Sequence, residues 1–157
     1  MDGTLLDSSE VVSDAFLEAF RQSGGVGHAP IEELHARSGV PFGKICSDLN
    51  PSPLMPALFR EASRRQNYRL RLFPFIQELI NRLVMKGTLI GVITGKDRLR
   101  TIEIFDLLGL GTFVNALVTP DEPPEAKPSP EGVWWLCGEL GVSVTECVLV
   151  GDSASDL

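Results

Sequence analysis

The sequence predicts an α/β protein that carries an all-helical insertion. In the second half, short apolar runs alternate with amphipathic helical patterns, and Gly or Pro residues separate them. Such apolar runs are typical of strands that are buried on both faces of a parallel sheet. Between residues 9 and 72 the apolar spacing is helical instead, with no strand pattern. The sequence therefore predicts a core formed by residues 1–8 and 73–157 and a helical insertion formed by residues 9–72.

The core pattern predicts a Rossmann-like arrangement, in which helices cover both faces of one parallel sheet. The first helix is expected between Pro74 and Gly87, where apolar residues recur every three or four positions. The following elements are expected in the order strand, helix, strand, helix, strand, at residues 89–94, 98–108, 114–118, 130–140 and 147–150. Short connections between these elements favour three layers, with the sheet in the middle. A further helix is expected to begin at Asp156.

The insertion is expected to contain three helices. The first spans residues 9–23 and ends at Gly24-Gly25, and the others span residues 30–37 and 53–70. Between the last two, the Gly and Pro residues of 38–43 predict a loop.

Composition and charge exclude several classes of protein. The 157 residues are 43% hydrophobic and 22% charged, which is typical of globular domains. The net charge of −7 argues against a nucleic-acid partner. No apolar run approaches the roughly 20 residues needed to cross a bilayer, so no membrane partner is expected. Cys46, Cys137 and Cys147 are odd in number and match no metal-site spacing, which predicts reduced thiols in a cytoplasmic protein.

Two carboxylates follow the last predicted strand. Asp152 and Asp156 are four residues apart and come directly after the apolar run 147–150. Open α/β sheets place their sites at the carboxyl ends of strands. A helix N-cap would explain one of these aspartates, but not both. An Asp-Gly-Thr turn at residues 2–4 opens the chain and is ordinary by itself.

Two further strand ends carry polar groups. Thr94-Gly95-Lys96 offers a hydroxyl and backbone N–H groups suited to an anion, and Lys127 lies beside Pro128 in a restrained loop. Each alone is explained by a strand-end Thr or a surface Lys. Together, three strand ends would deliver acid, hydroxyl and ammonium groups to one edge of the sheet. These groups suit phosphoryl transfer, which depends mainly on positioning and charge neutralisation.

In this order, the motifs at residues 2–8, Thr94, Lys127-Pro128 and 151–156 resemble the four signature motifs of the haloacid dehalogenase-like hydrolase superfamily. The helical insertion directly after the first motif resembles the cap of the phosphoglycolate phosphatase-like branch. The resemblance implies a Mg²⁺-dependent phosphatase that hydrolyses a small-molecule phosphomonoester through an aspartyl-phosphate.

The resemblance also implies a role for each motif residue. Asp2 would be the general acid and base, with its backbone carbonyl on Mg²⁺. Thr94 and Lys127 would bind the transferring phosphoryl group, and Asp152 and Asp156 would hold the metal ion. Two glycines beside these residues, Gly3 and Gly95, would bind substrate. Clustered carboxylates repel one another, so a divalent cation is expected among them.

The substrate-selecting insertion is the hardest part to interpret. Arg37 begins a loop of the kind that relatives lower onto the site, so it would bind a substrate carboxylate or phosphate, or else cap the preceding helix. Basic residues gather at Arg60, Arg64, Arg65, Arg69 and Arg71. A solvated helix face explains this cluster better than a steering patch for an anionic substrate. Neither His28 nor His35 is assigned a catalytic role.

The chain departs from the family pattern in two places. The family nucleophile lies two residues before Asp2, at the end of a central strand, and that position precedes Met1. We therefore expect a piece of a longer protein, cut at both ends and lacking that strand and a C-terminal part. Expressed alone, residues 1–157 are predicted to fold poorly and to be inactive, and an upstream strand ending in Asp should restore both properties. The second departure is Phe75, which stands where the branch usually has Gly.

Two other functions are compatible with the same motifs. A sugar-phosphate mutase would differ only in its cap and in how it excludes water. A non-catalytic relative would bind Mg²⁺ or an anion, although the intact motif residues argue against it. The expected partner is a small phosphate ester, and the expected assembly is a monomer or homodimer.

Overall fold

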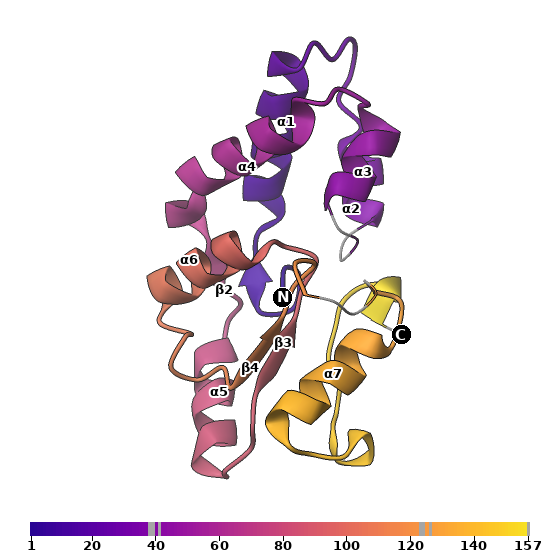
Figure 1. The fold of residues 1–157 in the computed structure, drawn as a ribbon. Coiled ribbons are helices and arrows are strands. Elements are labelled where there is room, and N and C mark those ends of the chain that lie inside the picture. The colour runs from indigo at the N-terminus through magenta and orange to yellow at the C-terminus, as the bar shows by residue number, and fades with distance from the viewer. Residues whose placement is uncertain (38–39, 41, 123–124, 126, 157) are drawn as a thin grey trace.

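The structure is a computed structural model that describes residues 1–37, 40, 42–122, 125 and 127–156. Figure 1 shows a helical cap at one end of the molecule and an α/β core at the other, with the N-terminus between them. The polypeptide passes from core to cap after β1 (Leu6–Asp7) and returns at β2 (Arg71–Leu72). The two crossing segments therefore lie close together at the border between the two parts.

Four helices form the cap: α1 (Ser9–Gln22), α2 (Ile31–Ala36), α3 (Phe42–Leu49) and α4 (Met55–Arg65). Helix α1 packs along α4, and the buried faces of all four helices share one apolar cluster. Aromatic rings dominate its centre, where Phe42 stacks on Phe59 with 3.6 Å between ring centroids. The cap thus has a hydrophobic core of its own.

The cap corrects two expectations. Helix α3 begins at Phe42, inside the stretch predicted to be a loop, because Phe42, Ile45 and Cys46 have helical spacing and pack against the other cap helices. The loop residues Ser38, Gly39 and Pro41 lie outside the described residues. The helix expected over 53–70 is shorter, since α4 ends at Arg65 and a 3₁₀ turn follows over Asn67–Arg69.

The core contains α5 (Ile76–Met85), β3 (Gly91–Ile93), α6 (Arg98–Leu108), β4 (Ala116–Val118) and α7 (Glu131–Leu140). Strands β3 and β4 pair in parallel, with Val92 opposite Leu117, and α7 packs on both strands. Two 3₁₀ turns, Val144–Glu146 and Ala154–Asp156, complete the chain. The second turn stands where a helix was expected to begin. From α5 to α7, the element order matches the predicted alternation of helix and strand.

Two expectations about strands were wrong. Residues 147–150 form no strand, and Val148 is 89% exposed, because none of the strands in the described residues hydrogen-bonds to this segment. At the border, β2 pairs antiparallel with β1, Leu72 opposite Leu6, although no strand was expected before residue 73. This pairing joins the two crossing segments. The division of the chain after residues 8 and 72 stays a prediction.

No helix within the described ranges is long and apolar enough to cross a membrane.

Phe75 has a backbone conformation that favours glycine, the residue that the family resemblance implied at this position. It precedes α5 with a φ of 67°, in the left-handed region, and its side chain is 80% exposed, so little packing offsets the strain. We expect Phe75→Gly to raise the free energy of unfolding by about 0.5–1 kcal/mol, the relief of left-handed strain less the entropy cost of glycine. Phe75→Ala keeps the strain and should stay within about 0.5 kcal/mol of the native chain. Urea unfolding measures both, and a less stable glycine variant would contradict the expectation.

Candidate active site

A cavity of about 260 Å³ lies between the core and the cap. All eight residues that the sequence singled out line it: Asp2, Gly3, Arg37, Thr94, Gly95, Lys127, Asp152 and Asp156. The core supplies seven of them, from segments far apart in the sequence, and the cap supplies Arg37. Apolar cap residues, among them Phe42 and Phe59, form part of the opposite wall. The motifs therefore meet in one cavity, whose cap side is largely apolar.

Asp2 and Lys96 form a buried ion pair in the cavity. Asp2 Oδ1 lies 3.5 Å from Lys96 Nζ, and their side chains are 25% and 8% exposed. Burial acts to raise the pKa of Asp2, but the Lys96 ammonium and the Ser8 hydroxyl outweigh it and hold the pKa below its usual range. Burial also lowers the pKa of Lys96, with Asp2 opposing. Asp2 Oδ1 is buried and accepts no hydrogen bond from the residues that the structure describes, so the Lys96 ammonium is the charge that stabilises it.

Lys127 and Asp156 form a second ion pair. Lys127 Nζ donates to Asp156 Oδ1 at 2.6 Å, and both side chains are 12% exposed. Asp156 Oδ2 accepts from the Ser153 hydroxyl at 2.6 Å and from its backbone N–H at 3.0 Å. Burial opposes ionisation, but these donors lower the pKa of Asp156 to about 2. Asp156 is therefore ionised at neutral pH, with both oxygens engaged.

The first and last motifs contact each other through Gly3 and Asp152. Thr4 Oγ1 donates to Asp152 Oδ1 at 2.7 Å. Gly3 has a φ of 73°, and a Cβ atom there would lie 2.0 Å from Asp152 Oδ2. Only glycine fits both the backbone conformation and this close approach.

Thr94 directly follows β3, and its hydroxyl contacts the loop after the strand. The hydroxyl oxygen accepts a hydrogen bond from the backbone N–H of Lys96 at 3.2 Å, and the Thr94 N–H donates to Val118 at 3.1 Å. An accepting hydroxyl keeps its proton for a ligand. Thr94 thus offers a donor at the end of the parallel strand pair.

The three acidic residues predicted to hold a metal ion do not form a ligand cluster. Across the described residues, no group of three or more His, Cys, Asp or Glu side chains is arranged to hold a metal ion. The reason is that Asp156 is bonded to Lys127 and Ser153, while Asp2 faces Lys96. Mg²⁺ is often held by only one or two carboxylates together with water and substrate phosphate oxygens. The exposed Asp152 fits such a site, which would have fewer carboxylate ligands than the sequence predicted.

Arg37, expected either to bind substrate or to cap the preceding helix, forms an ion pair that neither expectation included. It ends α2, lines the cavity and pairs with Asp48 of α3, Nη1 to Oδ2 at 2.6 Å. His35, which was assigned no catalytic role, is exposed and also lines the cavity, with Nε2 2.7 Å from the Ser13 hydroxyl. The cap side of the cavity therefore carries more polar groups than the sequence indicated.

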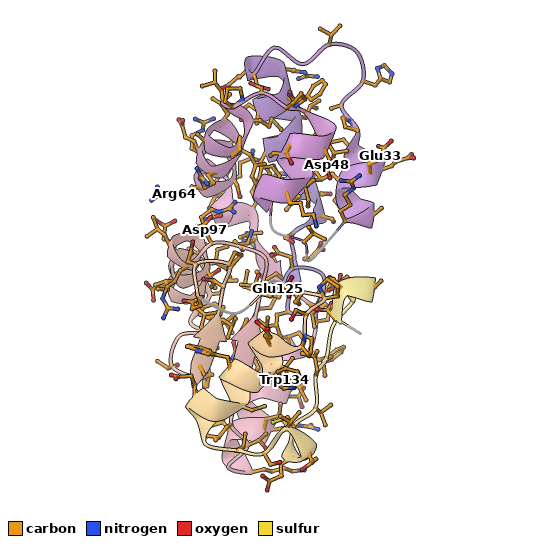
Figure 2. The ribbon with its side chains drawn as sticks, turned by 45° about the vertical axis from the view of Figure 1, so that its right-hand side comes forward. Glu33, Asp48, Arg64, Asp97, Glu125 and Trp134 are labelled. Atoms are coloured by element: carbon orange, nitrogen blue, oxygen red, sulfur yellow. The ribbon has the colours of Figure 1, made fainter. Side chains whose placement is uncertain are left out.

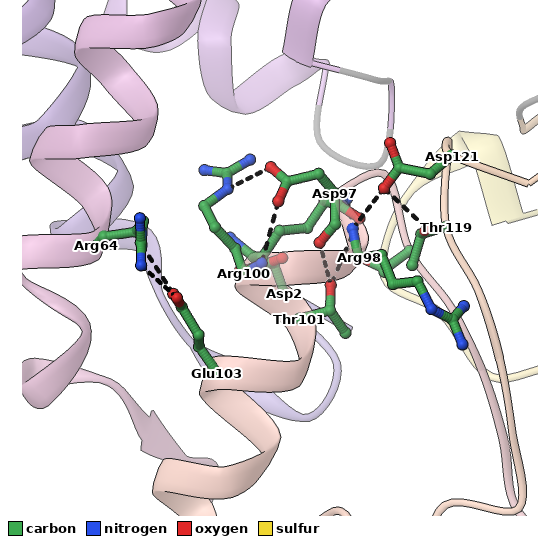
Figure 3. A network of polar contacts seen from close by, with 11 residues as sticks. Asp2, Arg64, Asp97, Arg98, Arg100, Thr101, Glu103, Thr119 and Asp121 are labelled. Atoms are coloured by element: carbon green, nitrogen blue, oxygen red, sulfur yellow. Dashed lines mark hydrogen bonds and ion pairs between the residues drawn. The ribbon is translucent and has the colours of Figure 1, made fainter.

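Most of the Arg cluster of the cap has acidic partners. Arg65 pairs with Glu18, Arg69 pairs with Asp14, and Arg64 makes a two-pronged contact with Glu103 of α6 (Figure 3). Since these charges are neutralised locally, they favour a solvated, ion-paired face over a steering patch.

Sequence reasoning missed two functional candidates, Lys96 and Arg100. Lys96 was part of the Thr94 motif but received no role. Arg100 was not considered, although it stands one helical turn before the fully buried Ile104 on α6. This helical spacing could have indicated Arg100 from the sequence, because it places a basic residue on a core-facing side of the helix.

Residues 1–157 match a family model described as haloacid dehalogenase-like hydrolase. The chain belongs to this family. Two relatives are each 26% identical and aligned over the whole chain: the pyrophosphatase PpaX of Oceanobacillus iheyensis, of which 74% is covered, and the phosphoglycolate phosphatase of Vibrio vulnificus, of which 75% is covered. These family members support the expected phosphoglycolate phosphatase-like branch.

A solved structure is also similar. A hydrolase from Pseudomonas syringae superposes with a TM-score of 0.85 at 21% identity, over 99% of this chain and 74% of that structure. The predicted fold class, a Rossmann-like α/β core with a helical cap, is thereby confirmed.

Proposed function

We propose that this hydrolase is a Mg²⁺-dependent phosphatase of a small-molecule phosphomonoester. One observation carries the proposal: all four motifs contribute residues to the same 260 Å³ cavity, namely Asp2, Thr94, Lys127, Asp152 and Asp156. Two relatives support it by name, since one is a pyrophosphatase and the other a phosphoglycolate phosphatase.

In the proposed mechanism, the phosphoryl group binds between two strand ends of the core. Lys127 and the Thr94 hydroxyl would donate to its oxygens, helped by the backbone N–H of Gly95, whereas the Gly3 N–H is already bonded to the Leu6 carbonyl. Charge-assisted donors of this kind stabilise negative charge that develops during transfer. The apolar cap wall would exclude water from the group that is transferred.

Asp2 would move the proton. The Lys96 ammonium keeps Asp2 ionised at rest, which suits a base. A phosphoryl dianion bound nearby would compete for that ammonium and favour protonation of Asp2 Oδ1. Asp2 would then donate to the leaving oxygen and, once ionised again, take a proton from water. We place the phosphoryl acceptor on an aspartate two residues before Asp2 in the natural protein, as the family resemblance implies.

Asp152, the backbone carbonyl of Asp2 and, after exchange of its Lys127 contact, Asp156 would hold Mg²⁺. When bound, the ion neutralises charge on the phosphoryl oxygens. Thr4 would orient Asp152 through its 2.7 Å hydrogen bond.

Phosphate release tests the proposal. The natural protein that contains residues 1–157 is incubated with small phosphate esters, with Mg²⁺ or with EDTA. We expect inorganic phosphate to appear with Mg²⁺ and to stop with EDTA. Isomerised sugar phosphate without phosphate release would identify a mutase instead, and ligand binding without turnover would identify a non-catalytic relative.

A cytoplasmic location, a monomer or homodimer, and the absence of nucleic-acid and membrane partners stay predictions.

A further inference from the structure

Arg100 is a buried cation, and one of its N–H groups has no hydrogen-bond partner among the described residues. The residue is 4% exposed, yet it lines the cavity between core and cap. Its Nε donates to Asp97 Oδ2 at 2.6 Å, while Asp97 also caps α6 by accepting from the Arg100 N–H at 3.0 Å. Figure 3 shows this arrangement, and Figure 2 labels Asp97 and Arg64 near the border between cap and core.

One terminal nitrogen of the guanidinium, Nη1, is buried and has no acceptor in the part of the chain that the structure describes. The Phe59 ring lies 5.4 Å from the Arg100 Cζ atom, which favours the cation but supplies no oxygen acceptor. An unsatisfied buried donor is costly, and it is costlier on a charged group. The arrangement is therefore better suited to a bound ligand than to an empty cavity.

The charges around the cavity indicate what that ligand is. Among the described lining residues, four acidic side chains (Asp2, Asp7, Asp152 and Asp156) face four basic ones (Arg37, Lys96, Arg100 and Lys127). Three basic residues already have other partners: Lys96 pairs with Asp2, Lys127 with Asp156 and Arg37 with Asp48. Arg100, held on one edge by Asp97, keeps Nη1 for another acceptor. Its position beside Phe59 of α4 is at the cap wall, where the non-transferred part of a substrate would lie.

We propose that Arg100 selects substrates that carry a second anionic group, a carboxylate or a second phosphoryl group, besides the phosphoryl group that is transferred. Nη1 would donate to an oxygen of that second anion. This inference rests on the proposed phosphatase function and specifies the substrate class for the same site.

The test compares matched substrates on the same protein. Phosphoglycolate is paired with 2-hydroxyethyl phosphate, which lacks the carboxylate, and pyrophosphate is paired with methyl phosphate. For each pair, kcat/KM is measured in the natural protein and in Arg100→Gln. We expect the native protein to prefer the doubly anionic member of one pair, and Arg100→Gln to reduce that preference about 10- to 100-fold, the value of a hydrogen bond to a charged group. The pair that responds identifies the second anion as carboxylate or phosphoryl.

The ratio within a pair does not depend on how much of a variant is folded. Arg100→Lys should keep part of the preference, since it retains the charge but not the planar fork. Arg64→Gln is the matched control, because Arg64 pairs with Glu103 at the same border and does not line the cavity. Its ratios should equal those of the native protein.

An unchanged ratio in Arg100→Gln, or no native preference in either pair, would overturn the inference while leaving the phosphatase proposal intact. If no ester is hydrolysed, the phosphatase proposal fails. Equilibrium binding of the same four compounds, by calorimetry, then decides the inference by the same ratio, and no binding at all also overturns it.

Discussion

Replacing Asp2 with asparagine is expected to lower the kcat of the natural protein by about 10²- to 10⁴-fold, the usual contribution of a positioned acid or base. The substitution keeps the size of the side chain but removes the group proposed to transfer the proton. It also leaves the Lys96 ammonium without the carboxylate that lies 3.5 Å away, so the pKa of Lys96 should fall further below its ordinary value. Initial rates of phosphate release at saturating substrate measure the loss.

A pH profile separates this role from a structural one. If Asp2 transfers the proton, the limb of the kcat profile that reports its ionisation disappears in Asp2→Asn, whereas a structural defect would lower the whole profile. Asp14→Asn is the control, because Asp14 is an exposed carboxylate on α1 that pairs with Arg69 at 2.7 Å, outside the cavity. It should retain native kcat. A kcat above one tenth of the native value in Asp2→Asn would rule out the proposed proton transfer.

Replacing Gly3 with alanine is expected to lower activity about 100-fold, because a displacement of about 1 Å in a catalytic group has effects of that order. The new Cβ would lie 2.0 Å from Asp152 Oδ2, so the carboxylate must move away from its hydrogen bond to Thr4. Since Asp152 is proposed to hold Mg²⁺, the Mg²⁺ concentration that gives half-maximal activity should rise as well. Titration of phosphate release with Mg²⁺ measures both effects.

Two control glycines separate the effect of the backbone conformation at Gly3 from the effect of its contact with Asp152. Gly24 has a φ of 86°, and a Cβ atom there would meet no described residue beyond its chain neighbours within 4 Å. Gly24→Ala therefore tests the left-handed backbone alone, at a cost of about 1 kcal/mol in unfolding free energy. Gly138 lies inside α7 with similar open space among the described residues, and Gly138→Ala should stabilise the helix by about 0.5–1 kcal/mol. Neither should change the Mg²⁺ requirement, and equal Mg²⁺ curves for Gly3→Ala and Gly24→Ala would show that contact with Asp152 is unimportant.

Helices were the part of the fold that local sequence predicted best. The expected helix at residues 98–108 is observed over Arg98–Leu108, between the side-chain cap of Asp97 and the left-handed Gly109. Both boundaries depend on residues next to the helix, so the sequence contains the signal. The helix α3 was missed because Gly43 indicates a loop, whereas packing of Phe42 on Phe59 stabilises a helix.

Strands were predicted less well, because a strand depends on a partner elsewhere in the chain. The run at 147–150 has the composition of a buried strand but pairs with none in the described residues. Arg71-Leu72 has no strand pattern, yet it pairs with Leu6-Asp7 across the border. Hydrogen bonding between distant segments decided both cases.

The sequence by itself determined the chemistry of the site: an aspartate beside a tight glycine turn, a strand-end threonine, a lysine and two further aspartates, in an order that indicates the family. Their residue types and spacing express that chemistry without reference to packing. Only the tertiary structure decided which distant groups meet: Asp2 pairs with Lys96, Asp156 pairs with Lys127, and the Arg100 guanidinium lies over the Phe59 ring. Burial and pairing arise when distant segments pack together, and they set which charges are neutralised and which donor remains for a ligand.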